Sequence, residues 1–380
     1  MDFNLTEEQS LLQDSVTKLL TTSYTFDQRK AASAAAGGYS GAMWRQFADL
    51  GLLALPFAEA DGGLGGGPVD VMLLMEAFGR HLVLEPYLAT IVLAGGCLRH
   101  AATEAQRAAW IPEIISGELT YSLAHVERGA RFNLEHVNTT ARRDGTEWII
   151  DGSKAYVLQG DTADRFIVSA RVADSTADSG IALFVLDAAA TGIGRRGYPT
   201  QDGLRAADLE LRSVRVSGDR QLAAADGLAT LRLVTDEAIA ATCAEAVGTM
   251  ECAHEITVEY LKQRKQFGVA IGSFQALQHR AVDMLVMVEQ ARSMAYFATM
   301  MLSDPDAAQR GAAMSAAKVQ VGRSARFVGE QAVQLHGGIG VTEECSVGHY
   351  YRRLTVLEVL FGDTHHHLAS LAQAGGLGTD

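Results

Sequence analysis

Three consecutive histidines, His365, His366 and His367, follow Asp363 and Thr364 near the C-terminus, in the stretch LTVLEVLFGDTHHHLASL. Imidazoles beside a carboxylate are groups that bind metal ions or transfer protons. Consecutive residues of a helix project about 100° apart, so these three side chains cannot converge on one metal ion. The i, i+4 spacing of a helical two-ligand site is also absent. We therefore predict no metal site, and expect Asp363 or Thr364 to cap a last helix whose first turn holds the histidines.

The bulk composition restricts the class of protein that carries this segment. The chain has 380 residues, of which 48% are hydrophobic and 20% charged, as in compact soluble proteins of two or three domains. Its 32 basic and 45 acidic residues give a formal net charge of −13. Nucleic-acid binding needs concentrated positive charge, so no nucleic-acid partner is expected.

The cysteines and the N-terminus indicate a cytoplasmic protein. The four cysteines form no CxxC pair, and their low density is unlike that of a disulfide scaffold. The N-terminal sequence MDFNLTEEQSLLQDSV lacks the basic and apolar regions of a signal peptide. No uninterrupted run of about 18 apolar residues is present, so no membrane insertion is expected.

Changes of periodicity predict three domains, the first two being residues 1–118 and 119–222. The first is helical, because Thr6 can cap a helix and apolar residues follow it at spacings of three and four. Its glycine-rich stretch DGGLGGGP (61–68) has no strand before it, so we predict a loop rather than a dinucleotide fingerprint. The second contains short alternating runs, with Asp144-Gly145 and Asp151-Gly152 as tight turns, and predicts an antiparallel, barrel-like β domain.

Residues 223–380 predict a C-terminal four-helix bundle. Ala-rich helices are expected from Asp226 to about Gln263, from about Ser273 to Leu302, from about Asp306 to Leu335, and around residues 365–373. A strand is expected after the pair Arg352-Arg353, just before the last helix. Together the three regions predict an α+β protein.

Two long segments of this bundle, YLKQRKQFGVAIGSFQALQHRAVDM (260–284) and QAVQLHGGIGVTEE (331–344), strongly resemble the acyl-CoA dehydrogenases. The GLLALPFAEADGGLG loop and the WIIDGSKAYV hairpin extend the resemblance over essentially the whole chain. It implies the fold of that family: an N-terminal helical domain, a middle β domain and a C-terminal bundle. It also implies an FAD-dependent oxidoreductase that removes hydrogens from the α and β carbons of an acyl-CoA thioester in acyl or lipid degradation. The expected electron acceptor is an electron-transferring flavoprotein, although acyl-CoA oxidases share the fold.

The resemblance also places the cofactor. In the family, FAD lies across a subunit interface, with the flavin on the β domain of one subunit and the ADP half on the bundle of its neighbour. This arrangement implies a homotetramer or an α2β2 heterotetramer with a related chain. The residues that match the family's ADP-binding positions are Arg264, Gln275, Gln334, Gly337 and Gly338.

Each of these residue types suits a dinucleotide. Arg264 is a cation for the pyrophosphate, and the two glycines let backbone N–H groups approach it closely. Thr364, with the backbone N–H groups of the following histidines, is expected to meet an FAD phosphate at the start of the last helix.

The catalytic base that the resemblance implies is missing from both of its usual positions. The family glutamate before the last helix falls on Gly362, and the alternative glutamate on the first bundle helix falls on Ala238. Glu237 is adjacent but projects about 100° away. Asp363 is the remaining candidate base, although its side chain is one methylene shorter than that of glutamate.

The β domain departs from the family as well, at positions that contact the flavin. Ala124 stands in place of a threonine and Arg131 in place of a serine. Residues 156–158, Tyr-Val-Leu, replace the family's Trp-Ile-Thr. The chain therefore keeps the residues that serve a neighbour's ADP and loses those that serve its own flavin.

Three hypotheses follow from this asymmetry. In the first, the chain is a catalytically silent subunit that lends its ADP-binding residues to a related partner chain, as in heteromeric enzymes acting on pimeloyl-CoA or steroid side-chain thioesters. In the second, it forms an active homo-oligomer with Asp363 as the base. In the third, it is a non-catalytic scaffold or sensor of the same fold that binds FAD or acyl-CoA.

Overall fold

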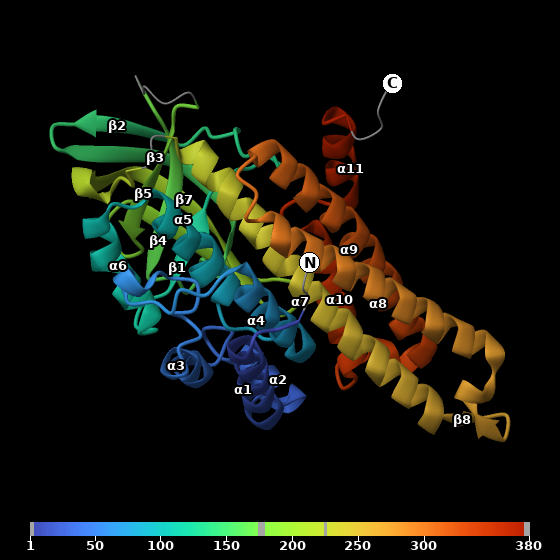
Figure 1. The fold of residues 1–380 in the computed structure, drawn as a ribbon. Helices are drawn as coiled ribbons and strands as arrows, with labels where there is room; N and C mark the ends of the chain where they lie inside the picture. Colours follow the sequence, from blue (N-terminus) through green and yellow to red (C-terminus); the bar gives the residue numbers. More distant parts are fainter. Residues whose placement is uncertain (1–3, 174–178, 224–225, 376–380) are drawn as a thin grey trace. The chain divides into compact units, whose positions relative to one another are not determined.

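The computed structural model describes residues 4–173, 179–223 and 226–375. The chain divides into two compact units, and each combines segments that are distant in the sequence (Figure 1). The first unit is formed by Met1–Lys30, Pro68–Val83 and Ile239–Asp380, and the second by Ala31–Gly67 and Leu84–Ala238. Two helices, α2 (Phe26–Ala34) and α7 (Gly227–Gln263), contain residues of both units.

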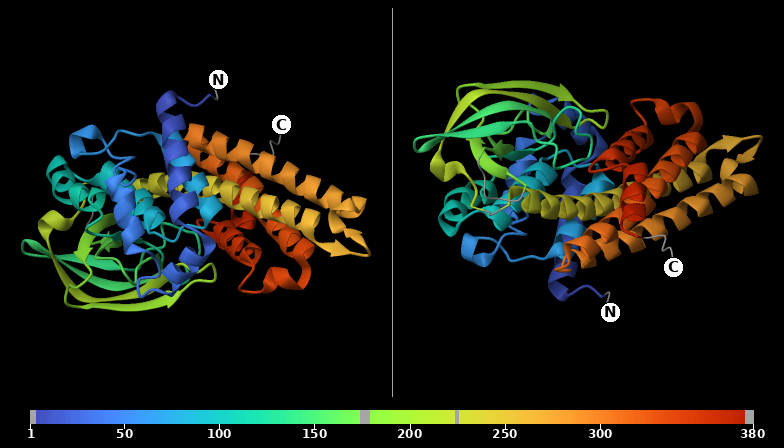
Figure 2. Two further views of the ribbon diagram at one scale, coloured as in Figure 1. Left: turned by 90° about the horizontal axis from the view of Figure 1, so that it is seen from below. Right: turned by 90° about the horizontal axis from the view of Figure 1, so that it is seen from above.

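The first unit is helical and is built around α9. Besides most of α7, its helices are α1 (Glu7–Ser23), α4 (Pro68–His81), α8 (Gln275–Met301), α9 itself (Ala307–His336), α10 (Ser346–Val359) and α11 (Thr364–Gln373). Helix α9 packs against α8, α10 and α11, and Figures 1 and 2 show α8 and α9 running side by side. Close approach depends on small residues. A Cβ atom added at Gly322 or Gly329 would come within 2.9 Å of Thr364 or Tyr351.

Most helix ends of this unit lie where the sequence predicts them. Thr6 forms a capping box with Gln9, in which the Thr6 hydroxyl accepts from the Gln9 N–H at 3.2 Å. Asp306 caps α9 by accepting from the Ala308 N–H at 2.8 Å. The observed bounds of α7, α8, α9 and α11 lie within two residues of those expected. Side-chain caps therefore mark the starts of α1 and α9, whereas α8 begins without a side-chain cap.

Helix α10 corrects the expected strand after Arg352-Arg353. Buried apolar residues recur in it at spacings of three and four, at Val347, Tyr350, Leu354 and Leu357. This helical period outweighs the β-branched residues of the segment. The bundle region consequently contains α10 in addition to the four predicted helices. The Arg353 guanidinium is buried and donates to both carboxylate oxygens of Glu245 on α7, at 2.6 and 2.8 Å.

The second unit combines short helices with a sheet of seven strands. Its helical elements are α3 (Gly41–Asp49), the 3-10 turn η1 (Glu59–Asp61), the π-helix η2 (Leu88–Ala94), α5 (Gly95–Ala101), α6 (Glu104–Ile115) and the 3-10 turn η3 (Gly218–Arg220). Its strands are β1 (Tyr121–Ala124), β2 (Thr140–Asp144), β3 (Glu147–Leu158), β4 (Arg165–Val172), β5 (Ile181–Asp187), β6 (Ile193–Pro199) and β7 (Arg205–Ser217). Residues 62–67 form a loop after η1, as predicted.

The sheet has the strand order β1-β4-β2-β3-β7-β6, with β5 paired to β4. Most pairs are antiparallel, but β4 runs parallel to both β1 and β2, so the sheet is mixed. The predicted turn at Asp144-Gly145 is present between β2 and β3. The predicted turn at Asp151-Gly152 is wrong, because these residues lie inside β3 at a shift of register against β7. The glycine there marks a bulge rather than the end of a strand.

None of the described helices is long and apolar enough to cross a membrane. Within the described ranges, no group of three or more His, Cys, Asp or Glu side chains is placed to hold a metal ion.

Candidate functional site

Residues predicted to bind the cofactor meet at one end of the helical bundle. Arg264 follows α7, Gln275 is the first residue of α8, and Gln334 lies in the last turn of α9 before the 3-10 turn η5 (Gly337–Val341). A two-stranded hairpin, β8 (Lys265–Gln266) and β9 (Val269–Ala270), joins α7 to α8.

Contacts between the three helices confirm that these ends lie together. The rings of Tyr260 on α7 and His336 on α9 stack with centroids 4.4 Å apart. The Arg280 guanidinium of α8 donates to the Gln331 amide oxygen of α9 at 3.3 Å. We call the group formed by Arg264, Gln275, Gln334, Gly337 and Gly338 the bundle-end site.

The bundle-end site is open and its side chains are available. Arg264, Gln275 and Gln334 are exposed, and their side chains make no hydrogen bond to any residue that the structure describes. The guanidinium and the two side-chain amides can donate hydrogen bonds to the oxygens of a pyrophosphate and of its neighbouring sugar. Because these side chains are exposed, a second surface would be needed to enclose a ligand that they bind.

The glycine pair fits the same ligand class. Gly337 has φ 65° and ψ −145°, a conformation that is essentially restricted to glycine. A Cβ atom added at Gly337 or Gly338 would meet no heavy atom of the described chain within 4 Å. The backbone here therefore faces open space, where a phosphate or ribose can approach closely. The donors and the open glycine backbone together fit the ADP half of FAD.

The turn between α10 and α11, residues 360–363, holds the second predicted region. Asp363 caps α11, because its Oδ1 accepts from the His366 N–H at 2.8 Å. This confirms the predicted cap. Thr364 donates both its N–H and its hydroxyl to Glu358 Oε1, at 3.0 and 2.9 Å. An FAD phosphate at this helix start would therefore have to replace the Glu358 carboxylate.

His367 is buried against this turn. Its Nε2–H donates to the Phe361 carbonyl at 3.1 Å, which leaves Nδ1 to accept from the Ser315 hydroxyl at 3.1 Å. Burial, and secondarily the nearby Lys318 charge, lowers the pKa of His367 to about 4, so the ring is neutral at physiological pH. It is one of the three histidines of the sequence motif, and its role is packing and hydrogen bonding within the bundle.

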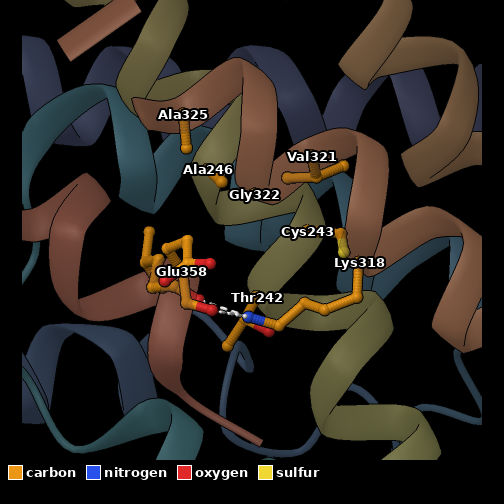
Figure 3. Close-up of a pocket in the computed structure, with 9 residues that line it drawn as sticks. Thr242, Cys243, Ala246, Lys318, Val321, Gly322, Ala325 and Glu358 are labelled. Atoms are coloured by element: carbon orange, nitrogen blue, oxygen red, sulfur yellow. Dashed lines mark hydrogen bonds between the residues drawn. The ribbon is translucent and has the colours of Figure 1, made fainter. Parts of the chain in front are cut away.

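A buried lysine supports the same turn. The Lys318 ammonium donates to the backbone carbonyls of Leu357 and of Glu358, the latter at 3.0 Å (Figure 3). It lines a narrow pocket between α7, α9 and α10 together with Thr242, Cys243, Ala246, Val321, Gly322, Ala325, Leu357 and Glu358. Burial lowers the pKa of Lys318 to about 8. The lysine thus ties the C-terminal end of α10 to α9.

The alternative base position lies in the second unit and carries no acid. Ala238 is fully buried. The adjacent Glu237 accepts from Arg99 and pairs with the His100 ring, both at 2.8 Å. Burial acts to raise the pKa of Glu237, but hydrogen bonding by His100 and the charge of Arg99 prevail and lower it. Both carboxylate oxygens of Glu237 are therefore occupied by side chains of α5.

The second unit contains a buried ion pair, Lys154–Glu127, that the sequence did not predict. Lys154 donates to Glu127 at 2.7 Å and to the Ser169 hydroxyl at 3.0 Å. Thr139 donates its N–H and hydroxyl to the same Glu127 oxygen. Burial opposes ionisation of Glu127, but these donors prevail and lower its pKa to about 2.

Tyr156 has φ 53° within β3, at the position where the family carries a tryptophan.

Neither Lys318 nor Glu358 was among the predicted site residues. A single lysine in the apolar stretch SAAKVQV is a sequence signal for a buried cation. Glu358 carries no such signal, because its partner Thr364 is reached only through the turn between two helices.

Comparison with known proteins defines the family. The chain matches the acyl-CoA dehydrogenase N-terminal domain over residues 6–118, the middle domain over residues 122–214 and the C-terminal domain over residues 226–376. It belongs to the acyl-CoA dehydrogenase family and has that family's three-domain fold.

Individual relatives differ in the reactions and assemblies for which they are named. The chain is 30% identical over 312 residues to acyl-CoA dehydrogenase FadE12 of Mycobacterium tuberculosis, covering 80% of each protein. It is 27% identical over 323 residues to the caffeyl-CoA reductase-Etf complex subunit CarC of Acetobacterium woodii, covering 83% of this chain and 85% of the relative. The structure of a variant of the Tcur3481-Tcur3483 steroid ACAD is similar with a TM-score of 0.88 and 29% identity, covering 98% of both chains.

Proposed function

We propose that this chain is a subunit of a heteromeric, FAD-dependent acyl-CoA dehydrogenase, and that it supplies the bundle-end site to the ADP half of an FAD. The flavin and the catalytic base belong to a related partner chain. The observation that carries this proposal is an asymmetry: the bundle-end site is open and complete in donors, whereas both family base positions, Gly362 and Ala238, lack a carboxylate. Bound FAD would supply the hydride acceptor for α,β-dehydrogenation of an acyl-CoA thioester.

The residues of this chain would act on the cofactor by binding and orientation. Arg264 would pair with the pyrophosphate, and Gln275 and Gln334 would donate their amides to the same half of the dinucleotide. The open backbone at Gly337 and Gly338 would admit close N–H contacts. None of these groups exchanges a proton with substrate, which is consistent with a subunit that is itself catalytically silent.

An apolar face of α8 supports the need for a partner chain. Val282, Leu285 and Val286 are 58%, 45% and 49% exposed, and they recur at helical spacing about two to three turns along α8 from Gln275. Phe267 on the hairpin is 89% exposed. Large apolar side chains gathered beside an unenclosed polar site are typical of protein–protein interfaces. We propose that an α2β2 heterotetramer covers this face, with a homotetramer as the alternative.

The remaining assignments follow from the same proposal. We propose an acyl-CoA substrate, an electron-transferring flavoprotein as electron acceptor, and a role in acyl or lipid degradation. A reductase such as CarC occurs among the relatives, so the direction of hydrogen transfer also belongs to the proposal. A cytoplasmic location is supported by four cysteines that are all unpaired.

One observation favours the active homo-oligomer as a second candidate. The helix cap uses only Oδ1 of Asp363, and Oδ2 makes no hydrogen bond to the described residues. A carboxylate oxygen at this turn is a chemically adequate base for an α-proton. In that case the chain would turn over acyl-CoA alone, and Asp363→Asn would abolish turnover while preserving the cap.

Flavin content separates these functions. The chain is expressed alone and together with a related chain that carries the family glutamate, and bound FAD is measured from the visible spectrum. We expect the chain alone to be colourless and the two-chain complex to be yellow and reducible by an acyl-CoA. A yellow, active protein obtained from this chain alone would overturn the heteromeric proposal in favour of the second candidate.

A further inference from the structure

The start of α11 already holds an anion of the chain's own making. Helix N-termini favour negative charge, and α11 has ten residues. Glu358 takes both hydrogen bonds that Thr364 can donate, and the Asp363 carboxylate takes that of the His366 N–H. Two carboxylates of the protein thus take the N–H groups of Thr364 and His366 and the Thr364 hydroxyl, and among the described residues only the His365 N–H of this first turn is left to a cofactor phosphate. A further anion here would also be repelled by both carboxylates.

Contacts on two sides fix the position of the Glu358 residue. Its backbone carbonyl accepts from the buried Lys318 ammonium, which fixes the end of α10 (Figure 3). On the other side, α9 presents Gly322, where a Cβ atom would lie 2.9 Å from Thr364 Oγ1 and 3.3 Å from Glu358 Cγ. The glycine therefore lets Thr364 and Glu358 lie directly on α9, and a Glu358 carboxylate that moved away would lose both hydrogen bonds from Thr364.

The position of the missing base is filled as well. Gly362 is buried with φ 119°, which a residue with a side chain rarely adopts. A Cβ atom there would lie 2.4 Å from His367 Nε2 and 2.7 Å from His366 Cδ2. Because His367 is fixed by hydrogen bonds at both ring nitrogens, it cannot move aside without losing them. A glutamate side chain has no room at this position.

We propose that the α10–α11 turn is closed by the chain's own side chains, with Glu358 in the place of a cofactor phosphate and His367 in the place of a base. The chain then contributes only its bundle-end site to FAD, and Glu358 and His367 determine that specificity. This inference rests on the proposed function. It identifies the residues that keep the α10–α11 turn from binding a cofactor phosphate and from carrying a glutamate base.

Hydrogen exchange over residues 359–370 of the full chain tests the role of Glu358. The measurements use the Arg264→Ala background, so that binding at the bundle end makes no contribution, and inorganic pyrophosphate as the probe. We expect pyrophosphate to leave exchange unchanged when Glu358 is present. In Glu358→Gln we expect about tenfold faster exchange, because Thr364 then donates to a neutral amide oxygen instead of a carboxylate, and we expect pyrophosphate to restore protection.

A matched control removes a carboxylate from another helix N-terminus. Glu8→Gln in α1 should leave exchange of residues 359–370 unchanged. Three results would each overturn the inference: protection by pyrophosphate while Glu358 is intact, no acceleration in Glu358→Gln, or no recovery on adding pyrophosphate to that variant.

Melting temperatures test the role of His367. We expect Gly362→Ala to lower the melting temperature strongly in the wild-type chain and by less in a His367→Ala chain, where the 2.4 Å clash with His367 is gone and the strain of φ 119° and the contact with His366 remain. Equal losses in both backgrounds would refute the assignment of His367. Failure of the proposed function has a different readout. The chain alone would then bind FAD, whatever the exchange rates and melting temperatures are.

Discussion

Replacing Lys318 by methionine should change how the stability of this protein depends on pH. Burial lowers the pKa of this ammonium from 10.5 to about 8. Below pH 8 the folded and unfolded states both carry the proton. Between pH 8 and 10.5 the unfolded state binds a proton that the folded state has released, so the free energy of unfolding rises with pH.

The size of the effect follows from the difference between the two pKa values. At about 1.4 kcal/mol for each tenfold change, the full contribution is about 3 kcal/mol, of which about 1.4 kcal/mol accrues between pH 7 and 9. Burial raises the pKa of Cys243 to about 11, which acts in the opposite direction as pH rises through the same range. The wild-type slope alone is therefore not diagnostic.

The assay compares urea unfolding of wild type and Lys318→Met at pH 7 and pH 9. Because methionine does not titrate, we expect the variant to lack the gain of about 1.4 kcal/mol, whereas Lys262→Met, which removes an exposed lysine of α7, should keep it. Parallel pH dependences for wild type and Lys318→Met would refute the assignment of Lys318 as a desolvated cation.

Three other substitutions have defined outcomes. Arg353→Ala leaves Glu245 buried without its bidentate partner and should cost about 3–5 kcal/mol in urea unfolding, and Arg353→Ala/Glu245→Gln should recover part of that loss. The Glu127 pKa of about 2 lies below its ordinary 4.5, so its stabilisation of about 3 kcal/mol is present above pH 4.5 and lost as pH falls towards 2. Glu127→Gln should flatten that acid limb and also destabilise the chain at pH 7, because Lys154 stays buried and unpaired. Gly337→Ala should lower the flavin content of the two-chain complex. Alanine rarely adopts φ 65° with ψ −145°, so the backbone of the bundle-end site at Gly337 would have to shift.

The fold was predictable wherever local signals decide it. The capping box at Thr6 and the cap at Asp363 delimit their helices through contacts within four residues, so short stretches of sequence contain the information. The segment of α10 was misassigned because its β-branched residues favour a strand locally, while the burial of one helical face on α9 decides the outcome. The turn expected at Asp151-Gly152 is wrong for a similar reason, because the pairing partners of these residues on β7 lie some 60 residues away.

The candidate site divides in the same way. Arg264, Gln275 and the glycine pair lie in long, specific motifs, and the antiparallel course of the helices brings them to one end of the bundle. The closure of the α10–α11 turn was not predictable, because it depends on a glutamate meeting a threonine across a turn and on the position of a histidine ring relative to Gly362. Such contacts follow from tertiary packing rather than from any spacing in the sequence.

The flavin content of an Arg264→Ala complex shows whether the bundle-end site of this chain holds FAD. The chain is co-purified with a related chain that carries the family glutamate, and FAD per complex is measured for wild type, Arg264→Ala and Arg45→Ala, the last being an exposed arginine of α3. We expect the Arg264→Ala complex to lose most of the bound FAD and the Arg45→Ala complex to keep it. Undiminished flavin in the intact Arg264→Ala complex would contradict this expectation.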